Sequence, residues 1–216
     1  MTLKQLIISS MAKYPYGRKY LFIYSFLKHL KKIGWLRSAE MQLPVDIEGK
    51  PLPWYTYAVI YFIEKKITPS MNIFEYGSGN STLWWSSRVS SVISIEHERS
   101  WFDKMKQRIS SNVEYRYCEL IDGGQYCRVV SEYEKRFDVI IIDGRDRINC
   151  AKNSLNALKD DGVIIWDNSD RDAYLKGYHY LWENHFKRLD FYGYGPLSIC
   201  GSCTSIFYRT NNCFGI

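Results

Sequence analysis

Residues 72–82 read Asn-Ile-Phe-Glu-Tyr-Gly-Ser-Gly-Asn-Ser-Thr, an apolar run of strand length that enters a glycine turn and then a helix start. Two glycines allow the turn to approach a ligand through its backbone, and Asn80 or Ser81 is suited to cap the helix that follows. Amide groups at such a helix start point at the bound molecule. The stretch therefore predicts a nucleotide-like ligand at the end of a buried strand.

The turn departs from the dinucleotide fingerprint, because Thr82 stands where that pattern has its third glycine. Glu75 precedes the first glycine by two residues, and Glu96 ends the next apolar run. Two carboxylates near one turn favour a ligand with a cation and a ribose over one with phosphates. An NAD-linked oxidoreductase is disfavoured for this reason, and also because no catalytic Tyr/Lys or His arrangement accompanies the turn.

From residue 72 onward, strand-length apolar runs alternate with amphipathic stretches, which is typical of parallel strands joined by crossover helices. The predicted strands are residues 72–76, 92–96, 113–118, 137–143 and 163–166. The predicted helices between them are residues 81–89, 100–109 and 148–158. Two further runs, 188–192 and 205–209, flank a loop rich in Gly and Pro and predict an antiparallel hairpin. We therefore expect an α/β, Rossmann-like sheet of five parallel strands with a C-terminal hairpin.

The chain is long enough for one domain with a sizeable core, and its 46% hydrophobic and 24% charged residues exclude disordered and fibrous classes. We expect an N-terminal helical extension at 1–49, followed by one domain at 50–216. Six cysteines without a secretory pattern predict ordinary thiols, and the Cys200–Cys203 pair is a weak zinc signal.

Residues 1–37 alternate apolar clusters with eight of the 29 Lys and Arg residues, at a spacing that predicts an amphipathic helix. We favour a lid or packing extension. A peripheral membrane contact by this basic helix, or a homodimer, stays open as an alternative. No secretory signal and no apolar run of about 20 residues is present in the sequence, so a cytoplasmic protein is expected.

Polar residues gather where the predicted parallel strands end, which is where open parallel sheets bind ligands. Glu75 and the glycine turn follow the first strand, and His97 follows Glu96 after the second. The later strands are followed by Asp143 and Asp146, and by Asp167 and Asn168. Clustering at one rim of the sheet is hard to explain by packing, and it predicts an active site.

These residues resemble the class I S-adenosylmethionine-dependent methyltransferases. Glu75-x-Gly77-x-Gly79 looks like the first motif of that family, and Glu96 looks like the acid that binds both ribose hydroxyls. The resemblance implies that S-adenosylmethionine is held by Glu75, Gly77, Ser78, Gly79, Ser81, Glu96, His97 and Asp143. In this alignment His97 would lie against the adenine.

The second half resembles the catechol and caffeoyl-CoA type of O-methyltransferase, in which Asp143, Asp167 and Asn168 would hold a divalent cation such as Mg²⁺. Those enzymes carry a lysine as general base, whereas here Arg145, Asp146 and Arg147 follow Asp143. Arginine stays protonated in water, so Asp143 or Asp146 would take the acceptor proton. The alternative is a metal-free site, with Asp143 as base and Asn168 orienting the acceptor.

Residues 50–209 also resemble a branch of bacterial class I methyltransferases. That likeness implies that Trp54 or Tyr57 walls the ligand site, while the Trp84-Trp85 pair is more typical of core. Aromatics near residues 174–182 are expected to form a helix whose exposed side lines the acceptor pocket.

The sequence thus predicts a cytoplasmic enzyme that moves a methyl group from S-adenosylmethionine to an oxygen of a small acceptor, such as a sugar or a phenol. An RNA-modifying methyltransferase is an alternative suggested by the basic N-terminus, although no RNA-binding module is recognisable and no nucleic-acid partner is expected. A non-catalytic cofactor-binding subunit is a second alternative, but it would not need Asp143, Asp167 and Asn168.

Overall fold

The computed structural model describes residues 2–216 and contains, within them, a seven-stranded sheet of order β3-β2-β1-β4-β5-β7-β6. All of its strands are parallel except β7, which pairs antiparallel with both neighbours. The strands are β1 Asn72–Tyr76, β2 Ser91–Glu96, β3 Val113–Tyr117, β4 Phe137–Ile142, β5 Leu158–Asp167, β6 Lys187–Gly193 and β7 Ser202–Tyr208. The predicted Rossmann-like sheet with its C-terminal hairpin is confirmed.

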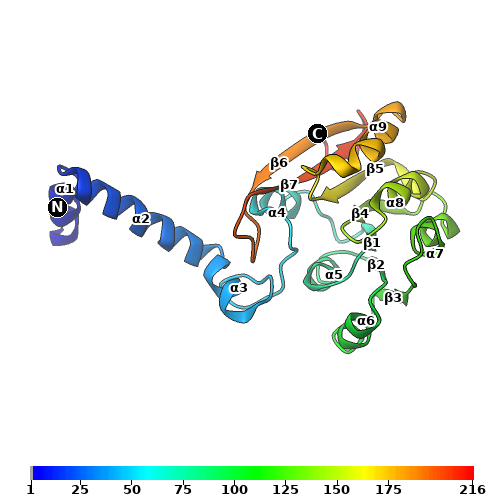
Figure 1. The fold of residues 1–216 in the computed structure, drawn as a ribbon, viewed down its shortest axis with the longest axis horizontal. Coiled ribbons are helices and arrows are strands. Elements are labelled where there is room, and N and C mark those ends of the chain that lie inside the picture. The colour runs from blue at the N-terminus through cyan, green and yellow to red at the C-terminus, as the bar shows by residue number, and fades with distance from the viewer. Residues whose placement is uncertain (1) are drawn as a thin grey trace.

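Helices cover both faces of this sheet, and Figure 1 shows the arrangement. One face packs against α4 Tyr57–Glu64 and α5 Asn80–Ser86. The other packs against α7 Gln125–Arg128, η1 Val129–Glu132, α8 Arg147–Ser154 and α9 Leu175–Glu183. The remaining elements of this part are α6 Arg99–Lys106, which contacts β2 and β3, and the short turn η2 Asp172–Tyr174.

Strand β4 explains why the core has two layers. All six of its residues are buried, because a central parallel strand is covered on both faces. Val139 and Ile141 belong to the layer under α4 and α5, whereas Ile140 and Ile142 belong to the opposite layer. The Trp84-Trp85 pair is buried in the first layer, as the sequence favoured.

Two local predictions were wrong. The helix expected over 148–158 ends at Ser154, and Leu158 instead begins β5, because it pairs with Phe137 of β4. Neither Asn80 nor Ser81 caps α5; the capping position is Gly79, whose N–H donates to Thr82 Oγ1 at 3.1 Å. The Asn80 amide instead donates to Pro44 O at 2.8 Å and so joins the turn to the N-terminal segment.

That segment contains α1 Leu3–Met11, α2 Pro15–Lys32 and α3 Trp35–Met41. Helices α1 and α2 project away from the sheet, while α3 lies beside it (Figure 1). The loop after α3 is fixed by Ser38, whose hydroxyl is bonded to both the N–H and the carbonyl of Val45. Between residues 2 and 216, no helix combines the length and the apolar character that crossing a bilayer requires.

Candidate active site

Strand register brings the predicted site residues to one rim of the sheet. Tyr76 pairs with both Ile95 and Ile142, and Ile142 pairs in turn with Trp166. The residues that come next in each chain segment therefore meet at the carboxyl ends of the strands. They are Gly77, Glu96, Asp143 and Asp167.

A cleft opens at this rim as three adjoining hollows of about 190, 300 and 270 Å³, all of which Asp143 lines. The first is lined by the glycine turn and residues 42–44, the second by Glu96, His97 and Arg147, and the third by Trp54 and Asn168. A larger hollow of about 390 Å³ lies elsewhere, between the end of α2 and helices α4 and α5. We place the site in the cleft, because strand ends and convergent polar groups coincide there.

The glycine turn is shaped by two different demands. Gly77 has a φ of +86°, and a Cβ on it would lie 3.0 Å from the Cα of Gly144, so the two loops touch backbone to backbone. Gly79 is not required by packing, because a Cβ there would meet only Trp101, at 4.0 Å. Trp101 Nε1 donates to Ser78 O at 2.9 Å and holds the turn in place. The space beside Gly79 is thus free for a ligand.

Glu75 presents an unused acceptor beneath the turn. Its Oε2 accepts hydrogen bonds from Thr82 Oγ1 and Ser94 Oγ, while its buried Oε1 has no partner among residues 2–216. Burial raises the pKa of Glu75 to about 7, against the lowering effect of its hydroxyl donors. Glu75 lines none of the three hollows, so it would act on a ligand through its charge: a cationic group bound above the turn would stabilise its ionised form.

Glu96 is buried and accepts four hydrogen bonds. Ser78 donates to Oε2 through its N–H (3.1 Å) and its hydroxyl (2.8 Å), and the N–H groups of His97 and Glu98 donate to Oε1 at 2.8 and 2.9 Å. A carboxylate offers about four lone-pair positions, so a ribose hydroxyl could bind only by displacing a present donor, of which the Ser78 hydroxyl is the one that is not a backbone N–H. That hydroxyl has an alternative partner in Tyr115, 2.7 Å away. The exchange leaves no buried polar group unpaired.

Arg147, at the start of α8, bonds to both of the loops that carry aspartates of the site. Its guanidinium is 7% exposed and donates to Asp143 Oδ1 (3.1 Å), Asp143 O (3.0 Å) and Gly144 O (2.9 Å). It also donates to the carbonyl of Asp167 and, at 3.4 Å, to Asn168 Oδ1. One side chain thus joins the loops after β4 and β5.

The predicted divalent-cation site does not fit this arrangement. Asp143 Oδ1 and Asn168 Oδ1, two of the three expected ligands, already accept from the Arg147 guanidinium, and Asp167 Oδ1 accepts from Thr204 Oγ1 at 2.6 Å. A divalent ion beside a buried, permanently charged arginine would be repelled. Within residues 2–216 no group of three His, Cys, Asp or Glu side chains is arranged to hold a metal.

The two aspartates differ in their access to the cleft. Asp167 is buried, and burial raises its pKa to about 6. Burial is also the main reason that the pKa of Asp143 lies well above its usual range, and the negative charge of Asp167 adds to it while Arg147 opposes it. The Asp143 side chain is 24% exposed and lines every hollow of the cleft. It is the carboxyl placed to exchange a proton with a bound molecule.

Solved structures that superpose on this chain identify its fold. An rRNA methylase from Streptococcus thermophilus matches with a TM-score of 0.54 and 14% identity, over 69% of this chain and 92% of that one. A precorrin-6y C5,15-methyltransferase from Geobacter metallireducens matches with 0.54 and 12%, over 70% and 87%. A methyltransferase-like protein from Silicibacter pomeroyi matches with 0.51 and 19%, over 74% and 89%. The chain has the methyltransferase fold.

No family model matches the sequence, and neither does a curated protein. At these identities the likeness concerns the methyltransferase fold and not the substrate. The role of each site residue therefore rests on the geometry of this chain.

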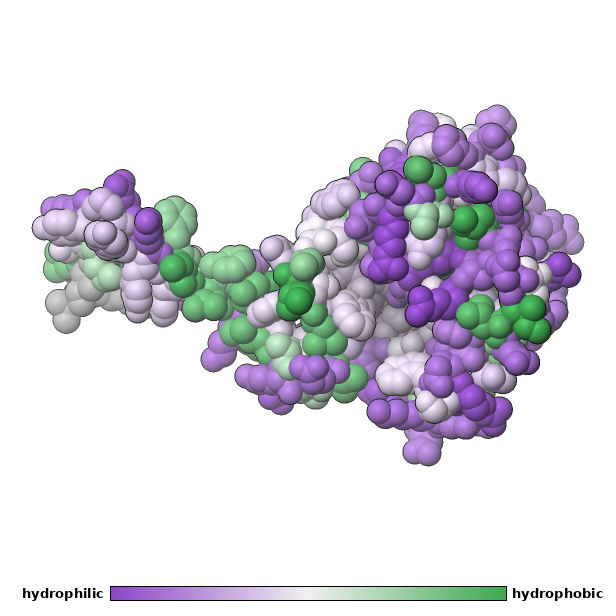
Figure 2. Space-filling view, in the orientation of Figure 1, coloured by the Kyte–Doolittle hydropathy of each residue, from purple (hydrophilic) through white to green (hydrophobic). Residues whose placement is uncertain are grey.

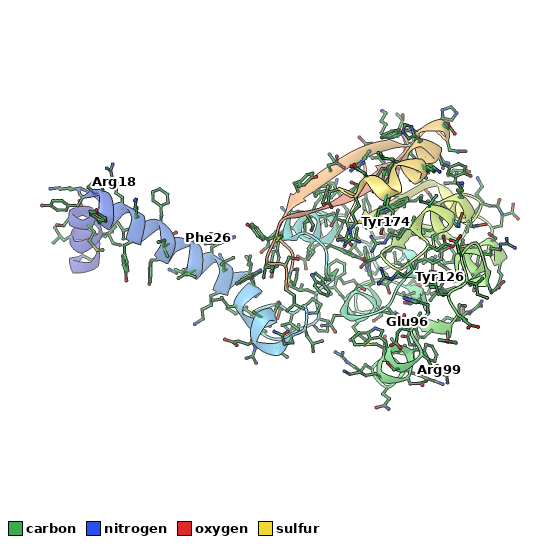
Figure 3. All side chains as sticks on the ribbon, in the orientation of Figure 1. Arg18, Phe26, Glu96, Arg99, Tyr126 and Tyr174 are labelled. Carbon is green, nitrogen blue, oxygen red and sulfur yellow. The ribbon has the colours of Figure 1, made fainter. Side chains whose placement is uncertain are left out.

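Most of the predicted cofactor residues line the cleft of the methyltransferase fold. The hollow of about 300 Å³ is lined by Gly77, Ser78, Ser81, Glu96, His97 and Asp143. Gly79 lines the neighbouring hollow. Figure 3 labels Glu96 and Tyr126, and the His97 ring packs edge-on against Tyr126 with centroids 5.5 Å apart.

Asp146, predicted as an alternative base, lies outside the cleft. Its φ of +47° turns the chain at the start of α8, and its carboxylate accepts from Gly123 N at 2.9 Å and from Asn149 Nδ2 at 2.7 Å. It does not line any of the hollows that contain Asp143. Its role is to fasten the loop before α7.

Of the aromatic residues predicted to wall the site, some line the cleft and others do not. Trp54 lines two of the hollows and donates to Ser198 Oγ at 3.2 Å, whereas Tyr57 lines the separate hollow near α2. The aromatic residues at 174–182 line none of the three hollows, and Tyr178 is buried against Trp166 and Phe207 in the core. The cysteines are all free thiols, and Cys200 is exposed while Cys203 is buried.

The roof of the cleft was missed by sequence reasoning. Residues 194–201, between β6 and β7, are tied to the N-terminal segment, because Trp35 Nε1 donates to Ser198 O at 3.0 Å and a Cβ on Gly195 would meet Tyr55 O at 2.4 Å. Leu197 lines the hollow above the glycine turn at a φ of +65°, a strained conformation for leucine. Tyr55 below is buried, and its hydroxyl has no partner among residues 2–216. These contacts are tertiary, so no local pattern marks them.

Proposed function

We propose that this chain transfers a methyl group from S-adenosylmethionine to an oxygen atom of a small acceptor, with Asp143 as general base. The methyltransferase fold supports the reaction class. The observation that carries the proposal is the position of Asp143, which lines the cleft together with the glycine turn and Glu96. S-adenosylmethionine, when bound, supplies an electrophilic methyl group on a sulfonium.

The glycine turn and the two glutamates bind and orient the cofactor. The negative charge of Glu75, buried beneath the turn, attracts the ammonium of the cofactor's methionine end. Glu96 accepts one ribose hydroxyl in the lone-pair position that the Ser78 hydroxyl leaves when it bonds to Tyr115 alone. The free space beside Gly79 lets the ligand approach the backbone of the turn. Each contact orients the methyl group for attack and so lowers the entropic part of the barrier.

Asp143 and Asn168 act on the acceptor. A raised pKa makes Asp143 a stronger base than an ordinary aspartate, so it accepts the hydroxyl proton as the oxygen attacks. Asn168 accepts from Arg147 through Oδ1, which leaves its Nδ2, unpartnered within residues 2–216, to donate to the acceptor oxygen. Arg147 stabilises the carboxylate form of Asp143 before the transfer and fixes its orientation. Arg147 is a positioning residue in this scheme.

Calorimetric titration with S-adenosylhomocysteine tests the cofactor half of the proposal. We expect binding by the wild type and a loss of about 10- to 150-fold for Glu96→Ala, because hydrogen bonds to a charged group are each worth about 1.5–3 kcal/mol. Glu119→Ala, which removes an exposed carboxylate, is the matched control and should bind like wild type. The absence of binding by the wild type would contradict the proposed methyltransferase activity.

Transfer of a labelled methyl group to a panel of sugar and phenolic acceptors tests the base. Asp143→Asn should lower the rate by about 10²–10⁴-fold. Asp146→Asn makes the same chemical change three residues further on, outside the cleft, and should leave the rate nearly unchanged. Equal rates for Asp143→Asn and the wild type would remove Asp143 from the mechanism.

RNA is the second acceptor class. One structure neighbour is an rRNA methylase, and the N-terminal segment of this chain is basic. Salt-dependent RNA binding, together with methyl transfer to RNA and to none of the small acceptors, would favour it. That result would keep the cofactor half of the proposal and replace the acceptor half.

A further inference from the structure

The projecting arm formed by α1 and α2 exposes large apolar side chains on its surface. Phe22 is 77% exposed and Phe26 is 55% exposed, in the middle of a helix that touches the rest of the protein only near its end, where Leu30 is buried. Figure 2 shows hydrophobic residues along this part of the chain. The exposed set is Leu6, Ile8, Tyr14, Tyr16, Tyr20, Phe22, Ile23, Tyr24, Phe26 and Leu27. An apolar surface of this kind marks an interaction site.

Helix α2 has two faces. At about 100° per residue, Phe22, Phe26, Ile23 and Leu27 fall on one side. Lys28 and Lys32 fall on the opposite side, whereas Arg18 and Lys19 lie one turn before Phe22 and Ile23 and border the apolar side. Arg18 and Phe26 are labelled in Figure 3. A helix with a basic face, an aromatic and aliphatic face, and too little overall hydrophobicity to span a bilayer has the composition of helices that lie in the membrane interface.

Charge decides between the partners that could cover this surface. The first 39 residues contain eight Lys and Arg and no Asp or Glu. Residues 40–216 are nearly balanced, with 21 basic and 23 acidic residues. Pairing of two arms would bring like charges together, and the acidic excess of two in residues 40–216 is too small to compensate. An anionic surface that also accepts apolar groups complements the arm, and an anionic lipid bilayer has both properties.

We propose that the α1–α2 arm, residues 2–32, docks this protein on an anionic lipid surface. Phe22, Ile23 and Phe26 enter the boundary between headgroups and acyl chains, and the basic face contacts the anionic headgroups. The exposed tyrosines of the arm lie at headgroup level, where their rings and hydroxyls are both satisfied. The arm lies on the bilayer without crossing it. This inference does not depend on the proposed methyl transfer.

Flotation with vesicles tests the proposal on the full-length protein. We expect it to float with vesicles of equimolar phosphatidylcholine and phosphatidylglycerol, and much less with phosphatidylcholine alone or at high salt. Arg18→Gln and Lys28→Gln should each weaken the partitioning about fivefold, since each basic residue near the surface contributes about 1 kcal/mol. Phe22→Ala and Phe26→Ala should each weaken it about tenfold.

The control variants are Tyr192→Ala and Ile121→Ala, which remove exposed apolar side chains far along the chain and should float like wild type. Because Phe22 and Phe26 are mostly exposed, their variants should keep the wild-type circular dichroism and melting temperature. Three results would overturn the proposal. They are flotation that does not depend on phosphatidylglycerol, a dimer that Phe22→Ala and Phe26→Ala dissociate in the absence of vesicle binding, and RNA binding by the arm in place of vesicle binding.

Discussion

Glu75→Gln should make the free energy of unfolding less sensitive to rising pH. The wild-type carboxyl is fully buried, and its folded pKa of about 7 lies above the ordinary value of 4.5, so the folded state binds its proton more tightly than the unfolded state does. Its stabilising effect is therefore present at acid pH and is lost as the pH rises from 4.5 through 7. A difference of 2.5 pKa units corresponds to about 3 kcal/mol by about pH 8. The substituted glutamine side chain keeps the shape and has no charge to bury.

Urea unfolding of both proteins between about pH 4.5 and pH 8 measures this difference. Asp143 and Asp167 titrate in both proteins, and the part of the raised Asp143 pKa that comes from the charge of Glu75 is included in the difference. The free energy of unfolding of the wild type should fall by about 3 kcal/mol more than that of Glu75→Gln, which corresponds to about 6–12 °C in melting temperature for a chain of this length. Parallel curves would refute the reasoning, since they would mean that Glu75 ionises in the folded state without penalty. Saturating S-adenosylhomocysteine, whose ammonium would pair with Glu75, should reduce the difference.

Four further outcomes are expected from the same geometry. Arg147→Met should lower the free energy of unfolding by about 3–5 kcal/mol in urea, because it removes the partner of the buried Asp167 carbonyl and of the partly buried Asp143 carboxylate; a loss below 1 kcal/mol would show that water replaces the guanidinium. Gly144→Ala should be destabilised by about 1–3 kcal/mol in the same assay, since its Cβ would lie 1.9 Å from the Tyr126 hydroxyl, and Tyr126→Phe should restore part of the loss. Asp146→Ala should lose about 1–3 kcal/mol of stability with unchanged affinity for S-adenosylhomocysteine in calorimetry, and a weakened affinity would contradict its place outside the cleft. EDTA should leave the methyl-transfer rate unchanged, because the Arg147 guanidinium already bonds to the oxygens of Asp143 and Asn168 that a cation would need. A rate that EDTA lowers and Mg²⁺ restores would show that a cation takes part.

The sheet could be predicted because its strands are defined by their own residues. Strand β4 is an unbroken apolar run, which buried parallel strands require. The beginning of β5 could not be predicted, since Lys159 to Gly162 carry no strand pattern and are placed in the sheet by the pairing of Leu158 with Phe137. Local pattern therefore located the strands, and tertiary pairing determined where one of them begins.

The sequence could predict which loops carry the site residues, but not which side chains of those loops face the cleft. Sequence placed Asp143 and Asp146 together after β4, but a single left-handed residue at the start of α8 sends Asp146 away from the cleft. The sequence also marked Arg147 as a departure from a familiar pattern, without indicating that the first turn of α8 would bury it between two loops. Such assignments depend on side-chain directions that a spacing of three or four residues does not determine.

The contact between Gly77 and Gly144 bears on how acceptor preference can change over evolution. With no free room for a side chain at either position, the glycine turn and the loop that carries Asp143 are in direct backbone contact. A larger residue at Gly77 or Gly144 would shift both loops, and with them both halves of the proposed reaction centre, so we expect this floor of the cleft to tolerate little sequence change. The roof, residues 194–201, is held by side-chain and backbone contacts that can be exchanged one at a time. We therefore expect acceptor preference to change through substitutions in residues 194–201, while the loops that meet at Gly77 and Gly144 stay unchanged.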